Sequence, residues 1–125
     1  MALPVSNVDN SIEFYKRWAS MEVVGEPVVV MGTKSGVMTD QDRGFRLSLI
    51  QSANVQPISG NFHLGIAFSS KEELVRRAEE AQKAGLLSMG PIDQPPPLGY
   101  WAMLADPDGH AVELSFGQGP PLVDR

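Results

Sequence analysis

Cysteine is absent from this chain of 125 residues, which excludes disulfide bonds and thiolate-bound metal sites. Because a chain without disulfides suits a reducing compartment, we expect a cytoplasmic protein. The sequence also lacks any run of about eighteen apolar residues, so no membrane-spanning helix is expected; its densest apolar run is Val28–Met31. Residues Met1–Ser6 carry neither a basic nor an apolar segment, and we therefore expect no signal peptide.

Positive charge is scarce as well. The net charge is −5, and no run of basic residues is longer than the pair Arg76-Arg77. Proteins that bind nucleic acid usually present a basic face, so nucleic acid is not an expected partner. With 42% apolar and 20% charged residues, the composition is that of a globular protein whose length suits one domain.

The first half of the chain predicts one helix followed by strands. Apolar residues at helical spacing predict a helix over Ser11–Ala19, with Asn10 or Asp9 as its N-cap. Alternating or continuous apolar residues then predict strands at residues 21–31, 37–39 and 45–50. Residues 52–61, which contain proline, glycine and small polar side chains, are expected to form a linker.

The same order of elements recurs after the linker. A strand is expected over Phe62–Phe68, followed by a helix that begins after Ser70, with Glu73 three residues later in a capping box, and ends at Gly85. The remaining expected elements are a strand at residues 86–89, a proline-rich loop at 90–97, and a hairpin of strands 101–105 and 111–116 around the turn Asp106–His110.

This recurrence indicates an internal duplication. Apolar positions match when Leu3–Ser6 is set on Ile66–Ser69 and Arg46–Leu49 is set on Glu113–Phe116. The sequence therefore predicts an α+β protein of two tandem βαβββ modules that form one structural domain. Their expected boundaries are residues 1–51 and 62–118, with the linker at 52–61 and a tail at 119–125.

Three segments of this pattern resemble the vicinal oxygen chelate superfamily: Leu3–Tyr15, His63–Phe68 and Asp106–Leu114. That superfamily includes glyoxalase I, bleomycin-resistance, fosfomycin-resistance and extradiol-dioxygenase proteins. The resemblance implies the glyoxalase/bleomycin-resistance/dioxygenase fold, in which two modules form a curved mixed sheet around a U-shaped cleft. It further implies a small-molecule ligand and a homodimer. It does not indicate one particular activity, because lyases, isomerases, oxygenases, transferases and drug-binding proteins all have this fold.

Strand alternation places several polar side chains on the sheet face opposite the helices. In the superfamily that the chain resembles, this face is the wall of the cleft. The ligand-binding residues that the resemblance implies are Arg46, Ser48, His63, Trp101, Met103 and Glu113. Whether His63 is a structural histidine, a ligand contact or a metal ligand stays open at this point. If the protein is an enzyme, Glu113 is the candidate catalytic residue.

The expected metal site is incomplete. Metal-dependent relatives take ligands from the head of the first strand and from the last strand of each module, and His63 and Glu113 match the second-module positions. In the duplication register the partner of His63 falls before Met1, and the partner of Glu113 is Arg46, whose guanidinium does not bind cations. Zinc and iron sites usually need at least three protein ligands.

Two functions follow as alternatives. The first is a metal-free, cofactor-free protein of the bleomycin-resistance kind that binds a drug or metabolite and confers antibiotic resistance, with Arg46 paired to Glu113. The second is a metal-dependent lyase, isomerase or dioxygenase. In it His63 and Glu113 bind Zn, Fe, Mn or Ni, Glu113 acts as a base, and a further ligand comes from an N-terminal extension, a partner subunit or the substrate. A degenerate scaffold or regulatory domain, with Arg46 and Glu113 locked together, is a third possibility.

Overall fold

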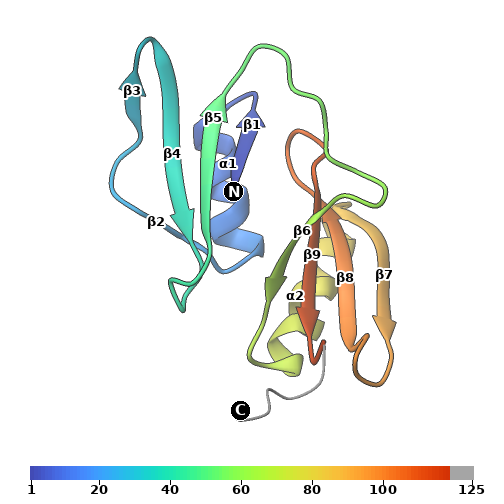
Figure 1. Cartoon of the computed structure of the whole chain (residues 1–125). Helices are drawn as coiled ribbons and strands as arrows, with labels where there is room; N and C mark the ends of the chain where they lie inside the picture. The colour runs from blue at the N-terminus through green and yellow to red at the C-terminus, as the bar shows by residue number, and fades with distance from the viewer. Residues whose placement is uncertain (119–125) are drawn as a thin grey trace. The chain divides into compact units, whose positions relative to one another are not determined.

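A computed structural model describes residues 1–118, and the expected tail at 119–125 lies outside the described residues (Figure 1). Within this range the elements, in chain order, are β1 (Ala2–Val5), α1 (Val8–Trp18), β2 (Glu22–Val23), β3 (Val28–Val30), β4 (Thr33–Thr39), β5 (Arg46–Gln51), β6 (Leu64–Ala67), α2 (Lys71–Lys83), β7 (Leu87–Asp93), β8 (Tyr100–Ala105) and β9 (Ala111–Phe116). No helix in this part of the chain is long and apolar enough to span a membrane.

The strands form two sheets of related topology. The first has the order β1-β5-β4-β2, with β3 also paired to β4, and the second has the order β6-β9-β8-β7. In the first sheet β1 pairs in parallel with β5, and in the second β6 pairs in parallel with β9. All other strand pairs are antiparallel. This α+β arrangement, with one helix after the first strand of each half, confirms the predicted fold class.

The chain divides into two compact units. Unit 1 comprises Met1–Ile58 together with the turn Asp106–His110, and unit 2 comprises Ser59–Ala105 together with the chain from Ala111 on. The turn between β8 and β9 is thus packed among residues of unit 1. Every strand pair stays within one module, and the module boundaries expected from the sequence remain a proposal.

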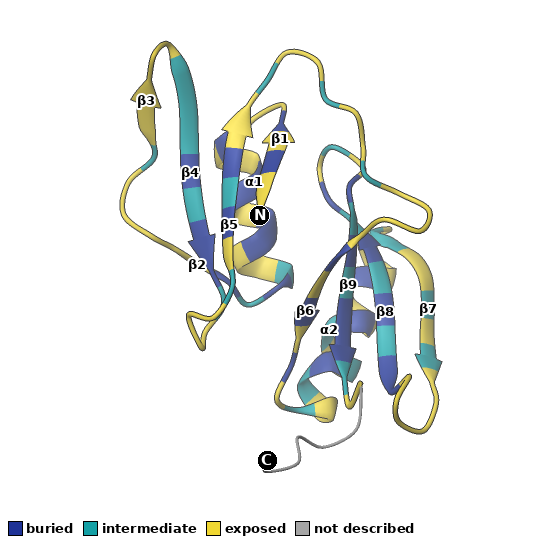
Figure 2. Ribbon diagram, in the orientation of Figure 1, coloured by how far each residue is buried: buried dark blue, intermediate teal, exposed yellow. Residues whose placement is uncertain are grey.

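The core of unit 1 lies between α1 and its sheet. Val8, Ile12 and Tyr15 follow one another at helical spacing and are buried. The helix α1, which has buried segments in Figure 2, packs on β4 and β5. Leu47 and Leu49 of β5 are fully buried. Complete burial of each such leucine side chain contributes about 1.5–3 kcal/mol, so this helix–sheet contact carries much of the unit's stability.

The core of unit 2 repeats this design with smaller helix residues. Leu74, Ala78 and Ala81 share the buried side of α2, which packs on β7, β8 and β9. Leu104 and Leu114 are fully buried in the sheet. Because the side chains of the two alanines are small, the backbone of α2 can lie close to the strands.

One helix starts earlier than expected. Neither Asn10 nor Asp9 is the N-cap of the first helix, because Asn7 takes that position: its side chain accepts a hydrogen bond from the Asn10 backbone N–H at 3.0 Å. Both residues therefore lie in the first helical turn. The second cap is confirmed, since the Ser70 hydroxyl accepts from the Glu73 N–H at 3.3 Å.

The expected strand at 21–31 is wrong as one element. It is split into β2 and β3 around Gly25, whose φ of +70° lies in the left-handed region, and Pro27. Conversely, the strand expected at 86–89 continues to Asp93 through Pro91. The register of β7 against β8 shifts between Met89 and Ile92, and such an irregularity accommodates proline in a strand.

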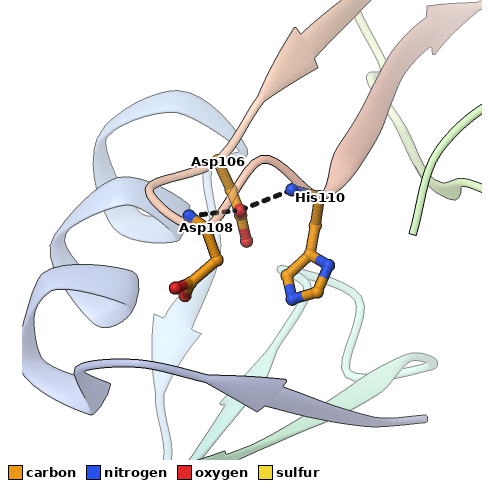
Figure 3. A group of neighbouring side chains, drawn as sticks. All are labelled: Asp106, Asp108 and His110. Carbon is orange, nitrogen blue, oxygen red and sulfur yellow. Dashed lines mark hydrogen bonds between the residues drawn. The ribbon is translucent and has the colours of Figure 1, made fainter. Parts of the chain in front are cut away.

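A buried carboxylate ties the β8–β9 turn to α1 within unit 1. Asp106 is 5% exposed, and its Oδ2 accepts a hydrogen bond of 2.8 Å from the Tyr15 hydroxyl. Its Oδ1 accepts from the backbone N–H groups of Asp108 and His110 (Figure 3). Three donors thus compensate the charge for its loss of water. Burial, with the neighbouring Asp106 charge and this hydrogen bond, holds the pKa of Tyr15 far above its ordinary range.

We predict that Gly36→Ala destabilises the protein by about 1–3 kcal/mol. A Cβ at Gly36 would lie 3.0 Å from Val8 Cγ1 and 3.1 Å from Ile12 Cδ1, so α1 would have to move away from β4. Gly44→Ala is the matched control, because nothing lies within 4 Å of its added Cβ. Urea denaturation of the three proteins measures the effect, and equal stabilities would contradict the packing described for α1.

We predict that Tyr15→Phe flattens the loss of stability at high pH. Since the folded-state pKa of Tyr15 is raised, its contribution is complete below about pH 10 and decreases by about 1.4 kcal/mol per unit above it, where the unfolded chain ionises first. The variant should be less stable at neutral pH and decline less steeply in alkali, as measured by urea denaturation between pH 7 and about 11.5. The pKa of Tyr100 is also raised by burial, but Tyr100 is present in both proteins and cancels in the comparison. Parallel curves would show that Tyr15 ionises freely.

Candidate functional site

The parallel pair β6–β9 brings His63 and Glu113 together in unit 2. Gly65 is the ladder partner of Glu113, and His63 lies two residues before Gly65, next to the start of β6. The His63 Nε2 is 3.3 Å from the Glu113 Oε2, and the two side chains are 33% and 14% exposed. The two side chains therefore form a close imidazole–carboxylate pair, and both are partly exposed.

A third residue holds the other oxygen of the carboxylate. The Gln118 Nε2 donates a hydrogen bond of 3.0 Å to Glu113 Oε1. Each oxygen of Glu113 therefore has its own side-chain partner, which restricts the rotation of the carboxylate. Sequence reasoning missed Gln118 because it follows the end of β9, where strand alternation no longer predicts the direction of a side chain.

Trp101 and Met103 lie on the same face of the sheet as Glu113. Met103 is the antiparallel ladder partner of Glu113, and Trp101 is that of Ser115. Both side chains are partly exposed, whereas Ala102 between them is buried. The face of β6, β9 and β8 that points away from α2 therefore presents one acid and one imidazole beside an aromatic and a thioether side chain.

Arg46 and Ser48 lie on the face of the unit 1 sheet opposite α1, as alternation predicts. Leu47 and Leu49 are fully buried, whereas Arg46 is exposed and Ser48 is partly exposed. Arg46 belongs to unit 1 and Glu113 to unit 2, and the expected pair of the two stays a prediction.

The register of the duplication is wrong by two residues in the last strands. Ala2 and Gly65 each lie five residues before the N-cap of their helix, Asn7 or Ser70. Ala2 pairs with Ser48, and Gly65 pairs with Glu113. Ser48, not Arg46, therefore holds the position equivalent to Glu113. Strand alternation has a period of two residues, so a slip of two preserves the apolar pattern that defined the register.

The turn of β8 and β9 contains three potential metal ligands, yet their atoms are already engaged (Figure 3). Ligand atoms of Asp106, Asp108 and His110 lie within 4.8 Å of one another. Both Asp108 oxygens accept from the Ser6 N–H, at 3.1 and 3.0 Å, and Asp106 has the three donors described above. The hydrogen bonds of these side chains therefore stabilise the turn.

His110 has the same structural role. It is fully buried, and its Nδ1 accepts a hydrogen bond of 2.9 Å from the Ile58 N–H. The Nε2 must then carry the proton, which it donates to the Pro4 carbonyl oxygen at 2.7 Å. Neither ring nitrogen has a free lone pair, so the donor set of this turn does not fit a metal ion.

His63 and Glu113 are spaced as two ligands of one metal ion would be. Two ligands about 2.1 Å from a tetrahedral ion are about 3.4 Å apart, close to the observed 3.3 Å between Nε2 and Oε2. Among the described residues, however, the one group of three or more potential His, Cys, Asp or Glu ligands is that of the β8–β9 turn. The pair at His63 thus lacks a third protein ligand of these types in residues 1–118.

The fold and this pair agree with one protein family. Residues 1–114 match the Glyoxalase/Bleomycin resistance protein/Dioxygenase superfamily, and the chain belongs to it. The uncharacterized protein PA2024 of Pseudomonas aeruginosa is 31% identical, over 94% of this chain and 86% of that protein. This match confirms the resemblance inferred from the sequence.

Two solved structures share the fold. A possible glyoxalase from Bacillus cereus has a TM-score of 0.69 at 23% identity and covers 92% of this chain and 94% of its own. The fosfomycin resistance protein FosX of Listeria monocytogenes, complexed with Mn(II) and a sulfate ion, has a TM-score of 0.72 at 16% identity, covering 94% and 88%. At these identities the likeness supports the fold alone.

We predict that the two histidines respond differently to alanine substitution. His110→Ala should cost about 2–5 kcal/mol, because it leaves a cavity and two unpaired backbone groups in the interior. His63→Ala should change stability by less than about 1 kcal/mol, since the residue is partly exposed. Urea denaturation at pH 7 measures both. A large loss in His63→Ala would identify it as a structural histidine.

Proposed function

We propose that the protein binds an amphipathic small molecule, a drug or metabolite, on the His63–Glu113 face, without a resident metal. The observation that carries this proposal is the 3.3 Å contact between His63 and Glu113, with no third ligand beside it among the described residues. Small-molecule sites typically combine an apolar wall with a few fixed polar groups, and this face has both.

We assign apolar contacts and hydrogen bonds with the ligand to different side chains of this face. Trp101 and Met103 offer an apolar surface to a ring or alkyl group. Glu113, held by Gln118, accepts a hydrogen bond from a hydroxyl or amine of the ligand, and the imidazole of His63 supplies one donor or acceptor according to its tautomer. Arg46 and Ser48 are proposed as further contacts from the first module. The proposed setting is a homodimer in the cytoplasm that protects the cell from an antibiotic.

A metal-dependent lyase, isomerase or dioxygenase is the second candidate. It is favoured by the separation of His63 Nε2 and Glu113 Oε2, and by the Mn(II) found with FosX, which shares the fold. His63 and Glu113 would hold the ion, which would polarise vicinal oxygens of the substrate. Ser48 at the position equivalent to Glu113 offers a neutral hydroxyl, so an additional ligand from elsewhere is required.

We predict that the protein, purified without a histidine tag, contains no stoichiometric zinc, iron, manganese or nickel. Elemental analysis measures the content, and calorimetric titration of the metal-stripped protein with MnCl₂ and ZnCl₂ measures affinity. One equivalent of tightly bound metal, lost in both His63→Ala and Glu113→Gln, would reject the metal-free proposal in favour of the second candidate. Glu79→Gln, an exposed carboxylate of α2, is the control for a general loss of charge.

We predict that ligands quench the fluorescence of Trp101. Trp18→Phe leaves Trp101 as the one tryptophan, because the sequence has two. Bleomycin, fosfomycin and substituted catechols are suitable probes. For a probe that binds, Glu113→Gln should weaken affinity about tenfold or more, whereas Glu79→Gln should not. Equal affinities in the two variants would place the bound probe away from Glu113.

A further inference from the structure

A pocket lies entirely within unit 1, at the end of the sheet where β4 turns into β5. Its volume is about 310 Å³, and its lining residues are Glu22, Val23, Val24, Gly25, Thr39, Arg43 and Arg46. None of these residues belongs to the His63–Glu113 face. The pocket therefore requires an explanation of its own.

The ladder and the turn explain how two arginines come to line one pocket. Thr39 is the ladder partner of both Glu22 and Arg46, so Glu22, Thr39 and Arg46 form one row across β2, β4 and β5. The turn that follows Thr39 is closed by Asp40, whose carboxylate accepts from the Phe45 N–H at 3.0 Å and whose carbonyl accepts from the Arg43 N–H at 3.0 Å. This turn returns Arg43 to the end of the row.

The backbone of Arg43 has an uncommon conformation, which it shares with Ser20 and Met31. Its φ is +57°, in the left-handed region that a residue other than glycine adopts only at a cost. Gly44 follows directly and has no such positive φ. The turn therefore holds arginine, and not its neighbouring glycine, in the strained position.

The residues that line the pocket carry an excess of positive charge, although the protein as a whole is acidic. Arg43 and Arg46 contribute two guanidinium groups against the single carboxylate of Glu22. Both arginines are exposed, and neither forms an ion pair within residues 1–118. Asp40 and Asp42 belong to the same turn but do not line the pocket. Two guanidinium groups each present a planar set of N–H donors that matches the oxygens of phosphate and phosphonate groups.

We propose that this pocket binds a tetrahedral oxyanion, a phosphate or phosphonate group, through Arg43 and Arg46. Two arginines suit a dianion with three terminal oxygens better than they suit a monoanionic carboxylate with two. Glu22 opposes the anion and weakens its binding. The site shares Arg46 with the contacts proposed above, but it involves neither His63 nor Glu113, so its test can fail or succeed separately from that of the proposed function.

The test is a titration of ¹⁵N-labelled protein with inorganic phosphate, with methylphosphonate and with acetate, followed by NMR at constant ionic strength. We expect saturable shifts confined to the amides of residues 22–25 and 39–46. Arg43→Gln and Arg46→Gln should each weaken phosphate binding about tenfold, and Glu22→Gln should strengthen it. Arg76→Gln, which removes one exposed arginine of unit 2, is the matched control and should have no effect. Thermal melting of each variant checks that it is folded.

Three results would overturn the proposal. The first is an absence of saturable shifts up to tens of millimolar phosphate. The second is equal phosphate affinity in Arg43→Gln, Arg46→Gln and Arg76→Gln. The third is acetate binding as tight as phosphate binding at the same amides, which would make the pocket a carboxylate site.

Discussion

The candidate site depends on the parallel pairing of β6 with β9. His63 and Glu113 are separated by about fifty residues of sequence, and only this ladder brings Nε2 and Oε2 within 3.3 Å. Parallel strands require a crossover connection, which α2, β7 and β8 provide. A mutation in the α2 core would therefore disturb the site as effectively as one at His63, although the reason would be folding and not chemistry. Stability and binding must be measured together for each variant.

The fold was predictable because several independent signals agreed. The capping box at Ser70, the alternation in the last hairpin and the recurrence of strand, helix and strands all indicated the same topology. The failures have one kind of cause. Apolar residues continue through residues 21–31 although Gly25 and Pro27 interrupt the strand, and a slip of two residues in β5 leaves the apolar pattern unchanged. The periodicity of apolar residues predicts which face of a strand is buried, but it does not predict where the strand ends or which residues pair across the sheet.

The candidate site was predictable in part for the same reason. Alternation correctly assigned Glu113, Trp101 and Met103 to one face, yet no local pattern indicates that Gln118 donates to Glu113. The histidines make a similar case. In the sequence, His110 stands in a turn and His63 at the head of a strand, and neither position reveals burial. The structure distinguishes them by the partners of their ring nitrogens: two backbone groups for His110 and one partly exposed carboxylate for His63.

The two sheets have related topologies, but their faces opposite the helices differ in charge. Equivalent ladder positions hold Glu113 in one sheet and Ser48 in the other, so only one of the two positions carries a carboxylate. The sheet of unit 1 instead carries Arg46 in the row that lines its pocket. Fixed charges at an exposed site act over about one Debye length, roughly 8–10 Å in physiological salt, so a net charge of −5 does not prevent a pair of arginines from attracting an anion locally. An acid and an imidazole on one sheet, with guanidinium groups on the other, are the basis of the two kinds of recognition that we propose.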